Sequence, residues 1–217
     1  MKRNILIISI ILVITVLLTG CGSKKDNSVK KVSSVSNKEV NEKSSDSKIL
    51  VAYFSKTGEN YNVGYVDVGN TALVATIIKD YLNCDSFEIV PVNKYPDNYN
   101  KATEVAKKEQ NEKARPKIES KLDNIDSYDT IFIGYPIWWG DLPMIMYTFL
   151  EEYNFDGKQI YLFNTHEGSG DAGTYNTVKK LLKGANVDTN GLSLQGSVAR
   201  TDKGKEETIS WLKDLGY

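Results

Sequence analysis

The chain has 217 residues, of which 41% are hydrophobic and 25% are charged, as expected for one globular domain with an extension. Its formal net charge of −1 provides no basic surface for nucleic acid, so no nucleic-acid partner is expected. One histidine and two cysteines are too few for the usual zinc or iron–sulfur ligand sets, so no metal site is expected.

The N-terminus has the pattern of an export signal. Lys2 and Arg3 precede Ile5–Leu18, an almost unbroken apolar run of 14 residues. As a helix this run spans ~21 Å, short of a ~30 Å hydrocarbon core, which favours a secretory signal over a transmembrane anchor. The next residues, Leu18-Thr19-Gly20-Cys21, resemble a bacterial lipobox. We therefore expect a lipoprotein signal over residues 1–21, with lipidated Cys21 anchoring the protein at the extracytoplasmic face of the cell membrane. A plain signal peptide with an accidental cysteine is the alternative.

Residues 22–47 have the composition of a flexible tether. They contain no aromatic residue and no apolar period, so they cannot bury enough surface to offset the entropy of ordering. Without Lys2 and Arg3 the mature chain carries 25 basic and 28 acidic side chains, a net charge of −3.

From Lys48 onward, predicted strands alternate with predicted helices. The apolar, β-branched runs that predict strands are 49–54, 86–92, 130–135, 159–164 and 192–198. Helical patterns lie at 70–82, 99–114, 143–153, 173–183 and 205–215. This alternation predicts one α/β domain over residues 48–217, a three-layer sandwich around a five-stranded parallel sheet. Ligands of such sheets bind at the carboxyl ends of the strands.

The loop after the first strand suits a phosphate group. Hydroxyls of Ser55 and Thr57, amides freed by Gly58 and the helix start at Asn70-Thr71 would together bind a dianion. The alternative is an ordinary helix cap next to a polar loop that binds no phosphate.

These residues resemble the flavodoxin family, whose phosphate loop reads aromatic-Ser-x-Thr-Gly-Asn-Thr. Here 11 residues, Glu59–Gly69, separate Thr57-Gly58 from Asn70-Thr71, as in a subgroup with an expanded loop. The resemblance covers 48–217 and includes Tyr95–Tyr99 and Arg115-Pro116. It implies a flavodoxin-like strand order of 2-1-3-4-5 and FMN as cofactor. It also implies that Ser55, Lys56, Thr57, Gly58, Asn70 and Thr71 bind the cofactor.

The loop after the third strand contains two adjacent tryptophans. The resemblance implies that Pro136, Ile137, Trp138, Trp139 and Gly140 contact the flavin ring. We expect Trp139 to face the ring, with Trp138 partly in the core. The alternative is that both tryptophans are core or interface residues. Asp141 is expected to cap the helix that begins at Pro143.

The loop after the fourth strand is rich in glycine. The resemblance implies that Thr165, His166, Gly168, Ser169 and Gly170 border the pyrimidine side of the ring. His166, the only histidine, is a candidate catalytic proton donor there, although a solvent-facing loop histidine is equally compatible with the sequence. Glu167 is expected to be solvated or to face a substrate.

Three functions remain open at this stage. The first is an FMN-binding electron-transfer protein at the outer membrane face, working with a redox partner protein. The second is an FMN-dependent reductase of a quinone or another small acceptor. The third is a non-redox ligand-binding lipoprotein. The sequence contains no P-loop and no Gly-x-Ser-x-Gly elbow, which argues against a nucleotidase and a hydrolase.

Overall fold

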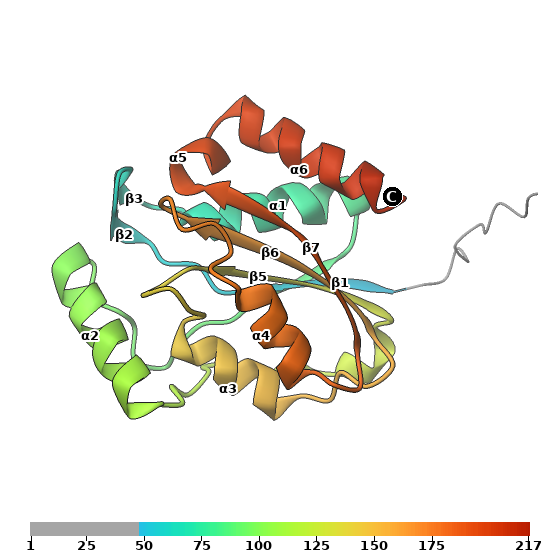
Figure 1. The fold of residues 1–217 in the computed structure, drawn as a ribbon, viewed down its shortest axis with the longest axis horizontal. Helices are drawn as coiled ribbons and strands as arrows, with labels where there is room; N and C mark the ends of the chain where they lie inside the picture. The colour runs from blue at the N-terminus through green and yellow to red at the C-terminus, as the bar shows by residue number, and fades with distance from the viewer. Residues whose placement is uncertain (1–47) are drawn as a thin grey trace, which may run out of the picture. The chain divides into compact units, whose positions relative to one another are not determined.

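Five parallel strands form the central sheet of residues 48–217, the part of the chain that the computed structural model describes. Their spatial order is β4-β1-β5-β6-β7, which is 2-1-3-4-5 in chain order, as predicted (Figure 1). They span β1 (Ile49–Tyr53), β4 (Asp85–Glu88), β5 (Thr130–Pro136), β6 (Gln159–His166) and β7 (Asn186–Gln195). The predicted signal, Cys21 and the tether over 22–47 lie outside the described residues.

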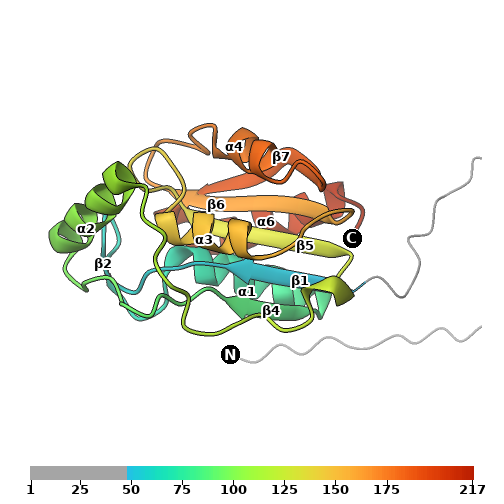
Figure 2. The same ribbon diagram turned by 90° about the horizontal axis from the view of Figure 1, so that it is seen from below.

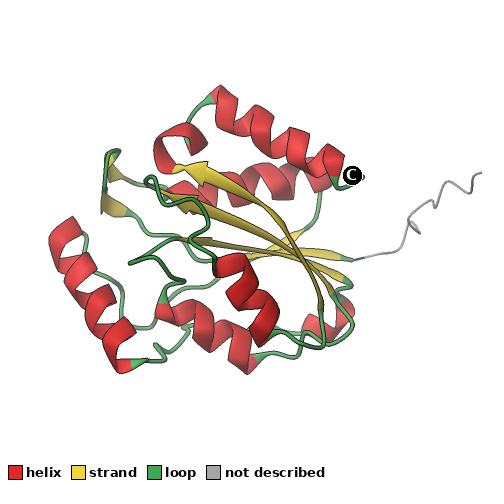
Figure 3. Cartoon of the chain, in the orientation of Figure 1, coloured by secondary structure: helices red, strands yellow, loops and turns green. Residues whose placement is uncertain are grey.

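Helices cover both faces of this sheet because its strands are apolar on both sides. Alternating side chains of β1 belong to different cores: Val51 faces one side, while Leu50 and Ala52 face the other. The Val51 side is covered by α1 (Asn70–Leu82), α5 (Gly196–Ala199) and α6 (Asp202–Asp214). The opposite side is covered by α3 (Met144–Glu152) and α4 (Thr174–Leu181). Figure 3 shows the strands between these two helical layers.

Helix α2 (Tyr99–Glu112) lies outside the two layers, at one end of the sheet (Figures 1 and 2). Beside it lies a hairpin of β2 (Gly58–Asn60) and β3 (Gly64–Val66), built from the expanded loop. The side chain of Asn98 caps α2 by accepting a 3.2 Å hydrogen bond from the N–H of Lys101. Only Ala102 and Ala106 of this helix are buried, so its contact face is narrow and made of small residues.

Two predicted strands differ from the observed ones. Strand β4 ends at Glu88 rather than Val92, because Pro91 lacks an N–H to donate and instead forms a bridge with Ile118. Strand β7 begins at Asn186, six residues before the prediction, and residues 196–198 belong to α5 rather than to a strand. The start of β7 is polar and contains Asn and Gly, so the apolar pattern of the sequence did not predict it as a strand.

The helices agree more closely with prediction. Helix α1 has the predicted bounds, and α6 begins three residues early because the side chain of Thr201 caps it at the N–H of Gly204, 3.4 Å away. Within residues 48–217, no helix is both long and apolar enough to cross a bilayer.

Candidate functional site

A cavity of about 380 Å³ opens at the carboxyl ends of β1, β5 and β6, within the usual size range of small-ligand sites. Three groups of residues line it. The last residues of the strands and the loops after them contribute Ser55, Lys56, Pro136, Ile137, Trp138, Trp139, Thr165, His166 and Glu167. The start of α1 contributes Asn70 and Thr71. The hairpin and α2 contribute Asn60, Tyr61, Tyr99, Ala102, Thr103 and Ala106.

The two halves of the predicted phosphate loop meet in space, although 11 residues separate them in the chain. The Ser55 hydroxyl accepts a 3.0 Å hydrogen bond from the N–H of Ala72, in the first turn of α1. Gly69 lies against both Ser55 and Lys56, so a Cβ there would overlap the Ser55 hydroxyl and the Lys56 carbonyl. Glycine is therefore needed at position 69, where the inserted segment rejoins the start of α1.

The start of α1 is held in place by polar contacts on two sides. The hydroxyls of Thr71 and Thr165 share a buried 2.7 Å hydrogen bond. The guanidinium of Arg200 donates to the Asn70 side-chain oxygen at 3.1 Å and to the Val68 carbonyl at 2.9 Å. First-turn amides of a helix have no intrahelical acceptor, and the helix dipole favours negative charge there. This end of the cavity therefore suits a phosphate group.

Lys56 stabilises the loop itself. Its ammonium donates to the carbonyls of Thr57 at 2.8 Å, Glu59 at 3.0 Å and Asp97 at 3.3 Å. Burial lowers the pKa of Lys56, and the Asp97 and Glu59 carboxylates oppose that shift. The neighbouring Thr57 and Gly58 do not line the cavity, because the hairpin begins at Gly58 and turns towards Asp97.

The hairpin connects the two sides of the cavity. On one side, the Glu59 carboxylate accepts hydrogen bonds from the N–H of Tyr99 at 3.0 Å and the Asn98 amide at 2.8 Å, at the start of α2. On the other side, the Asn62 amide donates to Glu167 at 3.1 Å. The rings of Tyr61 and Tyr99 lie 5.9 Å apart, and both line the cavity.

The tryptophan loop places Trp138 partly in the core, as predicted, and Trp139 at the cavity. Trp138 packs edge-on against Phe54 at 5.3 Å and Tyr95 at 4.8 Å, partly buried against the core. Trp139 lines the cavity and remains 54% exposed. Trp139 and Gly140 have positive φ values of 52° and 73°, and the backbones of Trp138 and Asp141 pair on either side of them. This is the tight two-residue turn that projects the indole, while Gly140 itself does not line the cavity.

The prediction that Asp141 caps α3 is wrong. Pro143 occupies the cap position, and the Asp141 carboxylate instead accepts from the Leu142 N–H at 2.8 Å and the Tyr147 hydroxyl at 3.0 Å. Burial, with Asp141 close by, raises the pKa of Tyr147 to about 12. Asp141 therefore ties the tryptophan loop to the first turns of α3.

His166 lines the cavity in a defined orientation. Its Nδ1 accepts a 2.9 Å hydrogen bond from the N–H of Gly168, which leaves the proton of the neutral ring on Nε2. Burial lowers the pKa of His166, and the Asp171 carboxylate opposes that shift. Gly168, Ser169 and Gly170 do not line the cavity; the two glycines shape the turn, with φ values of 112° and 62°.

Glu167 also lines the cavity. Burial raises the pKa of Glu167, while hydrogen bonds from Asn62 and the Gly196 N–H oppose that rise.

Sequence reasoning missed part of the cavity wall. Ala102, Thr103 and Ala106 line the cavity although α2 reads as a polar surface helix. Their only sequence signal was that three small residues share one face of that helix.

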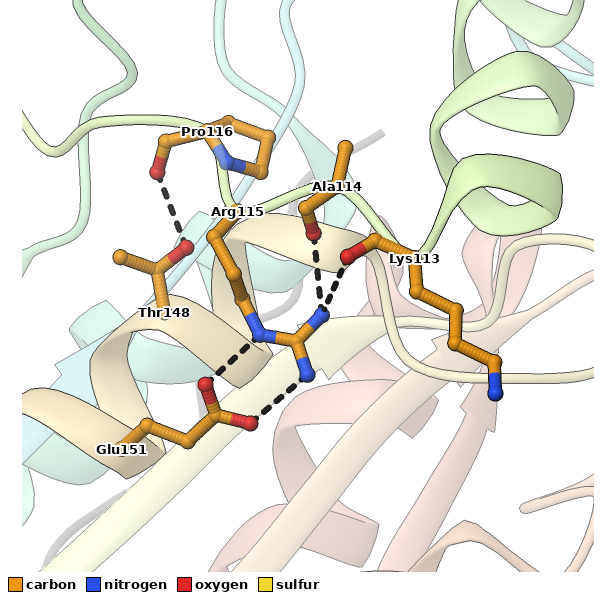
Figure 4. A network of polar contacts seen from close by, with 6 residues as sticks. All are labelled: Lys113, Ala114, Arg115, Pro116, Thr148 and Glu151. Atoms are coloured by element: carbon orange, nitrogen blue, oxygen red, sulfur yellow. Dashed lines mark hydrogen bonds and ion pairs between the residues drawn. The ribbon is translucent and has the colours of Figure 1, made fainter.

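An arginine anchors the end of α2 to α3 (Figure 4). Nε and Nη2 of Arg115 each donate to a carboxylate oxygen of Glu151 at 2.7 Å, and Nη1 donates to the carbonyls of Lys113 and Ala114. The guanidinium also lies over the Tyr147 ring, 5.1 Å from its centroid. The wall formed by α2 is thus fixed at its start by Glu59 and beyond its end by Arg115.

Comparisons with known proteins agree with this architecture. A family model described as flavodoxin matches residues 48–214. A protein assigned as a flavoprotein from Bacteroides eggerthii is 32% identical, with a TM-score of 0.61 and coverage of 79% of this chain and 99% of that one. A flavoprotein from Lactobacillus acidophilus, solved in complex with FMN, is 23% identical, with a TM-score of 0.55 and coverage of 70% and 95%. A search of curated proteins gave no match. The chain therefore belongs to the flavodoxin family.

Proposed function

We propose that residues 48–217 bind FMN in this cavity and transfer electrons. The observation that carries the proposal is the meeting of Ser55, Gly69 and the start of α1, at one end of a cavity whose other walls hold Trp139 and His166. Hydroxyls and helix amides suit a phosphate, and an indole suits a flat ring. The FMN complex of the Lactobacillus acidophilus flavoprotein supports this choice of cofactor.

Each side chain then has a defined task. Ser55 and Thr71 hold the phosphate beside the helix amides, and Trp139 provides a flat surface for the ring. The neutral ring of His166 has its proton on Nε2, which can donate to a bound ligand, and its lowered pKa favours this neutral form. FMN, when bound, supplies one- and two-electron redox chemistry.

We propose further that the protein works at the outer face of the cell membrane, anchored through Cys21. The support is the sequence of residues 1–21, with its short apolar run and lipobox-like end. Nicotinamide donors are scarce outside the cell, so a membrane quinol or another exported flavoprotein is the expected donor. Rapid reduction of the bound flavin by NADPH alone would contradict this.

A reductase of a small acceptor such as a quinone is the second candidate. The observation favouring it is the additional wall of Tyr61, Tyr99 and Ala106, which covers the cavity on a side that the strand-end loops leave open. Steady turnover of a soluble quinone, without a protein partner, would distinguish a reductase from a carrier.

The direct test is to add FMN to the purified protein, desalt it and record the visible spectrum and tryptophan fluorescence. We expect retained flavin absorbance and quenched fluorescence, and Trp139→Phe should remove most of the quenching. A protein that retains no flavin would leave only the third hypothesis, a non-redox binding lipoprotein.

A further inference from the structure

Three residues of α2 hold Trp139 in place. The indole Nε1 donates a 3.0 Å hydrogen bond to the carbonyl of Thr103. The backbone carbonyl of Trp139 accepts a 3.3 Å hydrogen bond from the side chain of Gln110. The Lys107 ammonium lies over the indole, 5.0 Å from the ring centroid, and also donates to Gln110 at 2.9 Å. We call Thr103, Lys107 and Gln110 the α2 clamp.

The indole borders two spaces. It lines the cavity, and it also lines an open groove along the outer face of α2. Lys107 lines the outer groove and is not among the described residues that line the cavity. The ammonium over the indole therefore comes from a residue of the outer groove and not from the cavity lining.

The cavity itself offers little free positive charge. Among the described residues that line it, Lys56 is the only lysine or arginine, and three carbonyls already accept from its ammonium. Glu167 contributes a carboxylate to the same lining. FMN gains negative charge on reduction. A cation beside the Trp139 indole would attract this charge and so compensate for the lack of free positive charge in the cavity.

We propose that Lys107 is a positioning residue of the flavin site: as part of the α2 clamp it holds the Trp139 indole against the cavity and places a positive charge beside it that favours reduced FMN. This rests on the proposed function, since it requires FMN in the cavity. Contacts between a cation and an exposed ring change populations about two- to fivefold, which sets the size of the expected effect.

The key variant is Lys107→Met, which keeps the aliphatic stem and removes the charge. Lys108→Met is the matched control, because it removes the same charge from the next residue of the same helix, in the same outer groove. Lys107→Arg retains a cation that stacks on indole and should rescue the wild-type behaviour.

Two measurements are made on each variant. In the FMN-free protein, exchange of the Trp139 Nε1 proton is followed by NMR, with Trp139→Phe identifying the signal. We expect exchange to become about two- to fivefold faster in Lys107→Met only. In the FMN-loaded protein, the preference for reduced over oxidised FMN should fall about three- to fivefold in Lys107→Met, a one-electron potential ~30–40 mV lower.

Other outcomes would overturn the proposal. Equal potential shifts in Lys107→Met and Lys108→Met would show a general charge effect without positioning. Unchanged proton exchange and potential in Lys107→Met would show that Lys107 does neither task. If the wild-type protein bound no FMN, the proposed function would fail, while proton exchange would still decide whether Lys107 holds the indole.

Discussion

At the scale of single residues, the phosphate end of the cavity depends on how the Ser55 hydroxyl divides its hydrogen bonds. Its oxygen accepts from the Ala72 N–H, so its own proton remains available to donate to a ligand. The same side chain thus serves the helix start and the proposed phosphate contact, and its removal should affect both.

Ser55→Ala should weaken FMN binding about tenfold, ~1.4 kcal/mol, because a charge-assisted hydrogen bond is lost. The FMN-free protein should lose ~0.5–1.5 kcal/mol in its free energy of unfolding, because the Ala72 N–H loses its acceptor. Flavin titration and urea unfolding measure the two effects. Ser210→Ala, on the exposed side of α6, is the control and should change neither. Unaltered FMN affinity in Ser55→Ala would place the phosphate elsewhere.

His166 should make stability depend on pH. Its pKa is lowered in the folded protein, so below about pH 6.5, the ordinary histidine pKa, the unfolded chain binds more protons. The folded state should therefore lose stability as the pH falls through 6.5, and above that pH the contribution should vanish. Urea midpoints between pH 5 and 8 test this against His166→Gln, which should lack this part of the dependence. Parallel profiles for the two proteins would contradict the assignment.

Residues next to the strands could be predicted from the sequence, because the ends of parallel strands meet at one edge of the sheet. Ser55, Trp139 and His166 line the cavity for this reason. Glu167 could not be assigned, because its partner Asn62 belongs to a hairpin that the sequence did not reveal.

At the scale of elements, the hairpin is the feature that separates this chain from the family's uninterrupted phosphate loop. Its strands have three residues each, too short to produce a recognisable alternation. Asn62 and Gly64 take the positive φ values of its turn, 62° and 73°. The residues of this hairpin thus form their own turn, apart from the phosphate contacts, provided that the chain returns closely at Gly69.

Gly69→Ala tests this close return. The added Cβ would meet the Ser55 hydroxyl and the Lys56 carbonyl, so the loop halves must separate. We expect a loss of ~1–3 kcal/mol in the free energy of unfolding and much weaker FMN binding. Gly64→Asn is the control, since nothing lies near that position and asparagine tolerates its positive φ. Calorimetry and flavin titration decide, and equal behaviour of the two variants would refute the requirement for a bare backbone at Gly69.

Glu59→Ala should loosen α2. The Tyr99 N–H would lose a carboxylate acceptor at the helix start, which costs ~1 kcal/mol. Hydrogen exchange over residues 99–106 should become faster, while exchange in α6 should not change. Protection of α2 equal to that of the wild type would show that the Asn98 cap alone is sufficient.

At the scale of the whole molecule, the layered sheet could be predicted from the alternation of strands and helices, because β1, β5 and β6 have strong apolar patterns, while the strand order came from the family resemblance. The position of α2 could not. A helix that follows the second strand would be assigned to a sheet face by the three-layer rule. Only Ala102 and Ala106 are buried, so contacts with the hairpin and α3 determine where it lies.

Within residues 48–217, the residues that line the cavity all lie between positions 55 and 167. Removal of residues 1–47 should therefore leave the FMN dissociation constant unchanged within about twofold, since the free energy of binding resides in the lining contacts. Flavin titration of the chain with and without residues 22–47 measures this. A marked loss of affinity in the shorter chain would assign the tether a direct role in the site.

The close approach of Gly69 to Lys56 also means that the hairpin branches from the domain at one place, in addition to its bonds from Glu59 to the start of α2 and from Asn62 to Glu167. A branch of this kind can change in length and sequence without moving the helix start where the phosphate would bind. Retention of the cofactor and choice of the acceptor can then diverge separately among relatives. Chimeras that exchange residues 63–68, none of which lines the cavity, should accordingly keep one flavin affinity while differing in the partners that they reduce.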